Sequence, residues 1–360
     1  MFIEVHAIQS FAPSCLNRDD TGSPKDCLFG GTRRARISSQ CFKRAIREYF
    51  NNSENFKENC GIRTRKIYNY ILEKLKDLDK PQEQKEEVVK EVIESTLKLD
   101  KKDNNLQYLV FFDKKAIESL VGQIKNNFDK LASKSKEINV KSIFSDCLEN
   151  KSAVDIALFG RMIADVPDKT IDASCQFAHS ISTHKISIED DFFTALDDLN
   201  TKSDLGAGMM GSIEFDSACF YRYANINVIK LLNNLKNNKE LALNSIEMFL
   251  KSFIFSIPSA RQSTFAAQNL PSFILITVNE NGSPWSLTNA FEKSINSSEN
   301  GYIKESIYKL DEYFGKLVKI YGDKSISKYW VSDTIENLTN LGKQSDLNVE
   351  KIIEEVIKNI

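Results

Sequence analysis

The 360-residue sequence has no long apolar run, which argues against a helix that crosses a membrane. Its longest apolar stretches, such as Phe273 to Val278, are far shorter than the roughly 18 residues that indicate a spanning helix. The first residues also lack the basic start of a signal peptide, because Glu4 stands there. We therefore expect a chain with no membrane partner, located in the cytoplasm.

The sequence also lacks the patterns that carry common chemistry. Its seven cysteines are odd in number, widely spaced and without a C-x-x-C pair, which indicates reduced thiols rather than disulfides. There is no P-loop lysine motif, no G-x-S-x-G and no H-E-x-x-H. With 41% hydrophobic residues, 14 Gly and 7 Pro, the composition excludes collagen-like and low-complexity classes. We expect neither a cofactor nor a metal.

The net charge of -2 would ordinarily disfavour a nucleic-acid-binding protein, but the charge is unevenly distributed. Residues 18–47 hold eight Lys and Arg against three Asp, a local charge of +5, which leaves about -7 for the rest of the chain. A basic patch on an acidic body concentrates the binding of a polyanion in one place.

Strand and helix patterns alternate without the regular cadence of a parallel sheet, which predicts the α+β class. We expect strands at 2–11, within 171–195, after residue 212 and at 273–278. Residues 12–37 and 197–212 are expected to be loops, and 58–149 to be an inserted helical region because Gly and Pro are rare there. Further helices are predicted at 239–256, 286–296, 301–321 and 346–358.

The segment after the first loop predicts a helix with two distinct faces. Ser38 and Ser39 suit the start of a helix, and the apolar positions that follow form one stripe, at Phe42, Ala45, Ile46, Tyr49 and Phe50. Gln40, Lys43, Arg44 and Arg47 form the opposite, cationic stripe beside the helix N-terminus, which suits phosphate oxygens. We expect the Gly30-Gly31 pair to allow close approach to a ligand, and Arg33, Arg34 and Arg36 to add charge.

The ordinary explanation of such a run is a solvated face that keeps the protein soluble. A solvated face would normally mix signs, however, and no acidic residue occurs between Cys27 and Arg47. The pattern favours binding of a polyanion through its backbone, with little sequence selectivity.

Several long segments resemble the CasC family, the CRISPR-RNA-binding backbone subunit of the type I-E Cascade surveillance complex. The matching segments occur in order along the chain: APSCLNRDD (12–20), FGGTRRARISSQCFKRA (29–45), VDIALFGRM (154–162), AHSISTH (178–184), FFTALDDL (192–199), FYRYANIN (220–227) and SLTNAFEK (286–293). The stretch from about 57 to 150 matches only in character.

The resemblance implies a modified RNA-recognition-motif (ferredoxin-like) palm with an inserted helical fingers region and a protruding thumb loop. The implied divisions are a first palm part at 1–56, mostly helical fingers at 57–172, palm strands at 173–196, a thumb at 197–216, and a second palm part with C-terminal helices at 217–360. Implied partners are a CRISPR guide RNA, target DNA, further copies of the chain and other Cascade subunits.

The resemblance also implies roles for individual residues. The residues that would bind the sugar-phosphate backbone of the guide are Arg18, Lys25, Ser38, Gln40, Lys43, Arg44 and Arg47. Met162 would contact bases, while Phe193, Thr194 and Met210 would hold a kink at which one nucleotide flips out. This agrees with the helix pattern, since apolar wedges beside a cationic surface bind single strands without sequence selectivity.

Three other patterns resemble functional motifs, but the sequence supports a nucleotide, zinc or catalytic-metal site at them only weakly. Gly206 to Gly211 fits G-x-G-x-x-G, but no strand-before, helix-after context is expected, which disfavours a nucleotide-binding loop. Cys175, His179 and His184 lack a fourth zinc ligand. The Asp19-Asp20 pair could hold a metal for phosphodiester hydrolysis, although carboxylates beside arginines more often orient the cations. A non-catalytic RNA-binding subunit is therefore the first hypothesis, a metal-dependent RNA-cleaving backbone subunit the second, and a small-nucleotide-binding protein the third.

Overall fold

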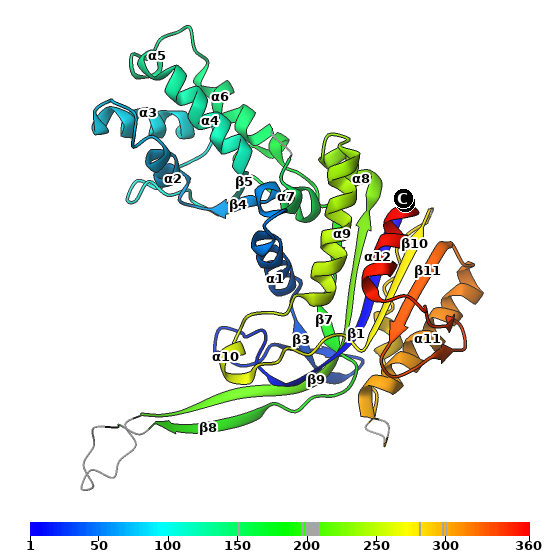
Figure 1. Cartoon of the computed structure of the whole chain (residues 1–360). Coiled ribbons are helices and arrows are strands. Elements are labelled where there is room, and N and C mark those ends of the chain that lie inside the picture. The colour runs from blue at the N-terminus through cyan, green and yellow to red at the C-terminus, as the bar shows by residue number, and fades with distance from the viewer. Residues whose placement is uncertain (150–151, 196–197, 199–208, 281, 297–298, 300) are drawn as a thin grey trace. The chain divides into compact units, whose positions relative to one another are not determined.

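The computed structural model describes residues 1–149, 152–195, 198, 209–280, 282–296, 299 and 301–360 (Figure 1). The chain divides into two compact units. Unit 1 comprises Met1–Ile46, Phe177–Asn225 and Ile246–Ile360, and unit 2 comprises Arg47–Gln176 and Ile226–Ser245. Within the described ranges, no helix is both long and apolar enough to cross a membrane.

Most strands belong to one large sheet. Among the described residues it has nine strands, in the order β11-β10-β1-β9-β7-β3-β2, with β6 and β8 also paired to β9. The registered pairs of β1 with β10, β10 with β11, β3 with β7 and β7 with β9 are all antiparallel. The strands are β1 (Phe2–Ser14), β2 (Asp26–Phe29), β3 (Thr32–Ile37), β6 (Cys175–Phe177), β7 (Ser180–Ser182), β8 (Glu189–Ala195), β9 (Met209–Asn227), β10 (Phe273–Asn279) and β11 (Ser325–Ser332).

Helix α11 (Gly301–Tyr321) covers the sheet of unit 1 with an apolar stripe. Ile307, Leu310 and Phe314 on this helix pack with sheet residues such as Phe273 and Trp330 in one buried cluster. The remaining elements around the sheet are α1 (Ser39–Asn52), α9 (Lys239–Phe255), α10 (Gln262–Phe265), the pair β12 (Asn337–Leu338) and β13 (Gly342–Lys343), and α12 (Val349–Lys358).

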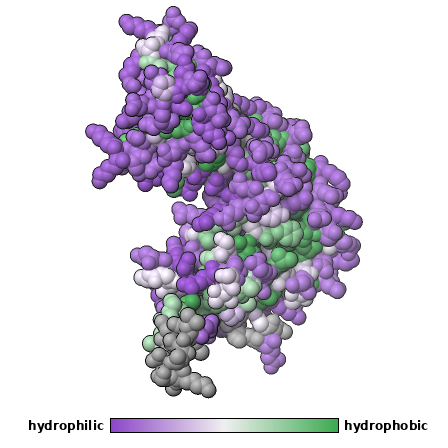
Figure 2. Space-filling model, turned by 60° about the vertical axis from the view of Figure 1, so that its left-hand side comes forward, coloured by the Kyte–Doolittle hydropathy of each residue, from purple (hydrophilic) through white to green (hydrophobic). Residues whose placement is uncertain are grey.

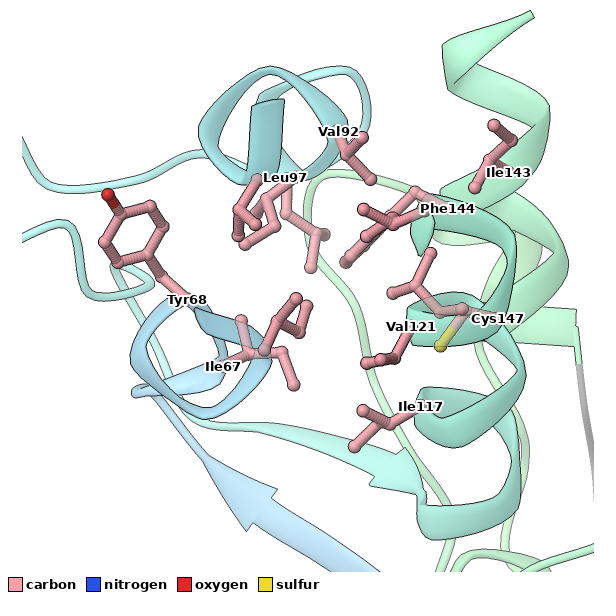
Figure 3. Packing of buried hydrophobic residues seen from close by; sticks show 14 of the residues in the cluster. Ile67, Tyr68, Val92, Leu97, Ile117, Val121, Ile143, Phe144 and Cys147 are labelled. Carbon is pink, nitrogen blue, oxygen red and sulfur yellow. The ribbon is translucent and has the colours of Figure 1, made fainter. Parts of the chain in front are cut away.

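Unit 2 has a helical core of its own. Its helices are α2 (Ile67–Lys74), α3 (Gln82–Glu94), α4 (Lys114–Asn126), α5 (Phe128–Ala132), α6 (Val140–Glu149), α7 (Val154–Phe159) and α8 (Val228–Asn234), with one ribbon of β4 (Gly61–Thr64) and β5 (Val110–Asp113). Apolar side chains of α2, α3, α4 and α6 meet in one cluster (Figure 3), including Ile71, Val92, Leu120 and Phe144. Hydrophilic side chains cover most of the face of α2–α6 that Figure 2 shows.

The α+β class is confirmed, as are the helices at α9, α11 and α12. Three local expectations are wrong, at residues 12–37, 286–296 and 209–212. Residues 12–37 are not an irregular loop, because Asp26–Phe29 and Thr32–Ile37 pair as a hairpin that turns at Gly30 and Gly31. In the segment 286–296, the described helical structure is one short 3-10 helix, Thr288–Phe291.

The palm, fingers and thumb boundaries stay predictions. Unit 2 starts at Arg47 and also contains Ile226–Ser245, which differs from the expected fingers at 57–172. Residues 209–212 belong to strand β9 and not to a loop, while 196–197 and 199–208 lie outside the described residues. The first half of the G-x-G-x-x-G segment, 206–208, therefore falls outside the described chain, and Met209, Met210 and Gly211 are in strand β9.

Candidate nucleic-acid interface

The start of α1 is capped as the sequence predicts. The Ser38 side-chain oxygen and main-chain carbonyl both accept the Cys41 N–H, at 3.3 and 3.0 Å. The Ser38 N–H in turn donates to the Asn17 side chain at 2.8 Å. Ser38 is buried, and its hydroxyl oxygen accepts one of the N–H groups that the first turn of the helix leaves without a partner.

The loop that carries Arg18 and Lys25 is tied to the same place. The Lys25 N–H donates to the Asn17 carbonyl at 2.8 Å, and the Arg36 N–H donates to the Lys25 carbonyl at 2.8 Å. Arg18 is exposed and Lys25 is half-buried. Main-chain bonds therefore bring two of the predicted site residues beside strand β3 and the N-terminus of α1.

Asp19 closes a tight turn in this loop. One of its carboxylate oxygens accepts the N–H groups of Thr21, Gly22 and Ser23 and the Thr21 hydroxyl, at 2.8 to 3.0 Å. These hydrogen bonds, led by that of the Thr21 side chain, lower the pKa of Asp19 below its ordinary value. The expected orientation of cations by Asp19 is thus replaced by bonds within its own turn.

The two faces of α1 are as predicted. Phe42, Ile46 and Phe50 are completely buried, whereas Gln40 and Arg44 are exposed and Lys43 is half-buried. Because α1 is amphipathic from its first turn, its core stripe fixes which side chains face solvent. Gln40, Lys43 and Arg44 therefore lie on the outer side of the helix.

A buried arginine beneath α1 was not anticipated. The Arg222 guanidinium lies over the Phe42 ring of α1 at 4.3 Å and over the Phe253 ring of α9 at 4.5 Å. It donates to the Gln9 side chain and to the Phe253 carbonyl, each at 2.5 Å. Burial lowers the pKa of Arg222 to about 9. Through its contact with Phe42, the residue packs α1 against the sheet.

Two residues expected at a ligand have structural roles. Arg34 is fully buried and donates to the carbonyls of Ser182 and Phe291, at 2.9 Å each, so it does not extend the surface charge. Gly30, with φ +56°, faces the Glu292 carbonyl so closely that a Cβ would overlap the oxygen. Gly30 was expected to let a ligand come close to the backbone, but the group that lies close to it is the main-chain carbonyl of Glu292.

Arg36 adds positive charge to unit 1 and contacts His179. An Arg36 Nη atom lies 3.0 Å from His179 Nδ1. Partial burial, then the charges of Arg36 and Lys25, lower the pKa of His179. A lowered pKa favours the neutral ring, and a neutral ring can accept the arginine N–H. Arg33, by contrast, is neutralised by Asp26 at 2.7 Å.

His184 shows no arrangement for zinc. Its Nδ1 lies 2.9 Å from the Lys185 carbonyl and its Nε2 accepts the Cys219 N–H at 3.1 Å, so both ring nitrogens are occupied. The ring also stacks on Tyr302, with centroids 3.6 Å apart. In the part of the chain that the structure describes, no group of three His, Cys, Asp or Glu side chains is placed to hold a metal ion.

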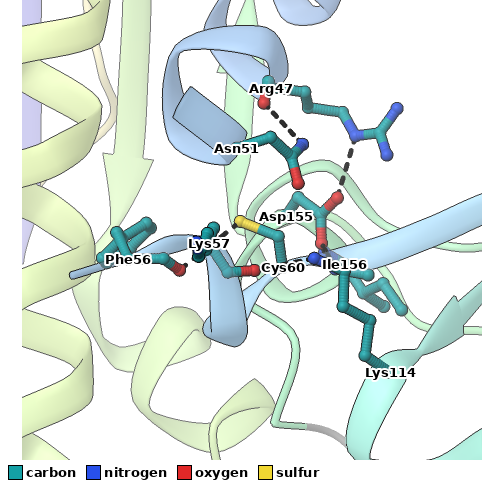
Figure 4. A network of polar contacts seen from close by, with 9 residues as sticks. Arg47, Asn51, Phe56, Lys57, Cys60, Lys114, Asp155 and Ile156 are labelled. Atoms are coloured by element: carbon teal, nitrogen blue, oxygen red, sulfur yellow. Dashed lines mark hydrogen bonds and ion pairs between the residues drawn. The ribbon is translucent and has the colours of Figure 1, made fainter. Parts of the chain in front are cut away.

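Arg47, the last residue of the predicted cationic stripe, is the first residue of unit 2 and has a carboxylate partner within that unit. Arg47 Nε and an oxygen of Asp155 are 2.8 Å apart, with the two side chains 20% and 1% exposed (Figure 4). The other Asp155 oxygen accepts the Gly61 N–H at 2.7 Å. The sequence pattern could not reveal this pair, because the two residues are 108 positions apart.

Met162 lies on the surface of unit 2, at the end of the G-R-M motif. Its side chain is 78% exposed. Gly160 has φ +80°, where a Cβ would lie 2.9 Å from main-chain atoms of Ile171 and Ala173. Buried Arg161 donates to the Leu148 and Lys169 carbonyls. The glycine and the arginine thus fix the backbone that exposes Met162.

Phe193, Thr194 and Met210 are at neighbouring positions of a two-stranded ribbon of β8 and β9, which extends from the sheet in Figure 1. Thr194 is directly opposite Met210, and Phe193 is opposite Gly211. Met210 is 66% exposed and Phe193 is half-buried. Because side chains alternate along a strand, Thr194 and Met210 share one face and Phe193 is on the other.

Two solved structures with a similar fold are chains of CRISPR RNA-guided surveillance complexes. A chain of a "CRISPR RNA-guided surveillance complex, pre-nicking" matches with a TM-score of 0.89 and 29% identity, and covers 100% of both chains. A chain of a "CRISPR RNA-guided surveillance complex" matches with a TM-score of 0.77 and 25% identity, again over 100% of both. Among curated proteins, none matches the sequence. The model of the family described as CT1975-like protein matches residues 3–359, so the chain belongs to this family, and the predicted resemblance to the CasC family is confirmed.

Proposed function

We propose that the chain is a non-catalytic backbone subunit that binds the sugar-phosphate backbone of a CRISPR guide RNA. The observation that carries this proposal is the outer side of α1. Gln40, Lys43 and Arg44 follow a capped helix start, next to the loop with Arg18 and Lys25. Cations beside the positive end of a helix dipole suit phosphate oxygens.

The exposed apolar side chains support contacts with bases. Met162 and Met210 are flexible and largely exposed, and Thr194 lies directly opposite Met210 on the ribbon. Such side chains stack beside or wedge against unstacked bases without reading their identity. In this proposal Met162 contacts bases, and Phe193, Thr194 and Met210 hold the flipped nucleotide.

The solved relatives support the proposed setting. Both are chains of RNA-guided surveillance complexes, and their similarity extends over the whole chain. We accordingly propose an RNA-recognition-motif-like palm, assembly of several copies along one guide in a type I-E Cascade, contacts with other subunits, and guide bases presented to target DNA. Seven free cysteines agree with a reducing compartment such as the cytoplasm.

Absence of catalysis is part of the proposal. One carboxylate oxygen of Asp19 accepts four hydrogen bonds from its own turn, so this side chain already has a structural role in the loop. The test is incubation of the purified chain, alone and assembled, with RNA and Mg²⁺ or Mn²⁺. Products that disappear in Asp19→Ala or Asp20→Ala would establish the RNA-cleaving alternative.

Native mass spectrometry tests binding and assembly. The chain is mixed with a guide-length RNA, and we expect several copies on one RNA molecule. A matched sample replaces the RNA with a mononucleotide. Equal occupancy of mononucleotide and RNA, with no multiple loading, would contradict the backbone role.

A further inference from the structure

Two arginines of unit 2 share one aromatic ring. Arg63 on β4 is directly opposite Phe111 on β5, and its guanidinium carbon lies 5.5 Å from the ring centroid. The guanidinium carbon of Arg47 lies 4.5 Å from the same centroid. The Phe111 ring itself packs against the small cluster of Ala153, Ile156 and Ile171. The ring is therefore a supported platform for two cations.

Asp155 fixes one of these cations without enclosing it. Its contact with Arg47 is made through Nε, at 2.8 Å. Its other oxygen is held by the Gly61 N–H at 2.7 Å and the Ile156 N–H at 3.1 Å, so the carboxylate cannot turn freely. Figure 4 shows the two Nη atoms of Arg47 on the side away from Asp155. The fork that pairs with phosphate oxygens is thus held in position, on a side chain that is 20% exposed.

The local charge is not balanced. Arg63 is exposed, and among the described side chains no carboxylate oxygen lies within 4.0 Å of it. Asp155 pairs with Arg47 only, so the charge of the Arg63 guanidinium over the same ring is not compensated by an ion pair. Guanidinium groups stack on aromatic rings and bind phosphate through two parallel N–H bonds. An anion with several oxygens would relieve the repulsion between the two cations.

We infer that Arg63 and Arg47, supported by Phe111 and positioned by Asp155, bind a phosphodiester group of single-stranded RNA. This inference rests on the proposed function and adds a second contact, in unit 2, to the surface of unit 1. Because Arg63 is open to solvent, a free phosphate would bind weakly. A strand already held elsewhere presents its phosphate at a high effective concentration.

The first test is Arg63→Ala in the full chain, with Lys66→Ala as the matched control for loss of an exposed cation nearby. For a guide-length RNA, we expect the Arg63 variant to reduce the slope of log K against log salt by about 0.7, which is roughly fivefold in affinity at 0.1 M salt. Arg63→Lys keeps the charge and loses the fork, so its slope should be restored more fully than its affinity. Equal behaviour of Arg63→Ala and Lys66→Ala would overturn the inference.

The positioning role of Asp155 can be tested with a substitution for which charge alone predicts the opposite change in RNA affinity. Asp155→Asn makes the protein more positive, so a surface that acts by charge alone would bind RNA more tightly. We expect weaker binding instead, because Arg47 loses its fixed orientation. Phe111→Leu preserves apolar packing but removes the ring, and should also weaken binding. Thermal unfolding confirms that each variant is folded, and tighter binding by a folded Asp155→Asn variant would overturn the positioning role.

Two further measurements distinguish failure of this inference from failure of the proposed function, and an RNA site from a site for small anions. If Arg44→Ala weakens RNA binding while the Arg63 and Asp155 variants match Lys66→Ala, this inference fails and the proposed function survives. If Arg44→Ala has no effect either, both fail. A mononucleotide serves as the small-anion probe. If Arg63→Ala reduces binding of the mononucleotide as much as binding of RNA, the site is one for small anions and not for a strand.

Discussion

Phe193 and Gly211 are directly opposite each other on the β8–β9 ribbon, and the phenyl ring occupies the space where a side chain of residue 211 would begin. A Cβ at Gly211 would lie 2.6 Å from Cζ of Phe193 and 2.8 Å from Cε1. The glycine is therefore required for the position of the ring.

Gly211→Ala should displace the Phe193 ring while leaving the phosphate contacts in place. Turning the ring out of its rotamer costs about 1 kcal/mol. With 2-aminopurine placed in turn along a guide RNA, the wild type should show bright positions where a base is unstacked, and the variant should show weaker ones. Ser212→Ala, an exposed neighbour on the same strand, is the control. Equal fluorescence from all three proteins would contradict the role of Phe193.

Removing charge from α1 should change the response of RNA binding to salt. Arg44→Ala and Lys43→Ala should each reduce the slope of log K against log salt by about 0.7, because each phosphate contact releases bound counterions. The loss should be similar for unrelated RNA sequences. Lys319→Ala and Lys351→Ala remove exposed charges from α11 and α12 and should leave the slope unchanged. An unaltered slope in the Lys43 and Arg44 double variant would refute the α1 assignment.

Arg47 should differ from Lys43 and Arg44 in its effect on stability. Its removal leaves the Asp155 carboxylate buried with two N–H donors but without a cation. We expect Arg47→Ala to reduce the free energy of unfolding by about 2 to 3 kcal/mol, below the range for a fully buried pair because Arg47 keeps some contact with water. Urea unfolding measures the change, and Arg44→Ala should stay within about 0.5 kcal/mol of wild type.

The core face of α1 provides a comparison between two fully buried residues. Ile46→Ala should reduce the free energy of unfolding by about 2 to 4 kcal/mol through the cavity it leaves. Phe42→Ala should cost more, about 3 to 5 kcal/mol, since it also removes a ring that covers the Arg222 guanidinium. Equilibrium unfolding in urea tests the order. A Phe42 variant as stable as wild type would mean that the assigned core face is wrong.

Glu4, in the sheet, determines how one contribution to folding stability changes with pH. Glu4 is buried and accepts bonds from the Tyr223 hydroxyl at 2.7 Å, the Trp285 N–H at 2.6 Å and the Asn279 amide. Burial, only partly offset by these bonds, raises the pKa of Glu4 from 4.5 to about 7. Between pH 4.5 and pH 7, Glu4 keeps its proton in the folded state, whereas in the unfolded state it has already released it. This contribution to stability is full below pH 4.5 and is lost as the pH rises through 7.

Glu4→Gln removes that titration. Relative to wild type, its free energy of unfolding should rise by about 3 kcal/mol between pH 4.5 and pH 8, at 1.36 kcal/mol for each pKa unit. The glutamine can be accommodated if the Asn279 amide turns over, since the Asn279 oxygen has no hydrogen-bond partner among the described residues. Urea unfolding at several pH values measures this, with exposed Glu118→Gln as control. A difference between variant and wild type that is constant with pH would contradict it.

Local patterns predicted α1 well and its partners poorly. The spacing of Phe42, Ile46 and Phe50 was sufficient to orient the helix, because a 3.6-residue period and a cap are properties of neighbouring residues. The contact of Arg47 with Asp155 depends on how distant segments pack. Arg34 was counted as surface charge for the same reason, since its acceptors come from residues 182 and 291.

Strand pairing overrode local composition at two places. The turn residues at 12–37 and the glycines near 211 suggested loops, but β2 pairs with β3, and Met209–Phe215 pairs with β8. Partners elsewhere in the chain decide whether a weak strand former is in a sheet. The turn at Asp19 could have been anticipated from the sequence Asp-Asp-Thr-Gly-Ser, because an aspartate side chain commonly closes such turns.

The burial of Arg222 separates the salt dependence of binding from that of folding. Its charge lies between two rings and away from water, so dissolved ions screen it little. The contacts proposed for RNA are on the surface and weaken steeply as salt increases. Concentrated salt should therefore strip RNA from the chain while α1 keeps its place on the sheet. The emptied protein could then be returned to dilute buffer and loaded with a different guide without refolding.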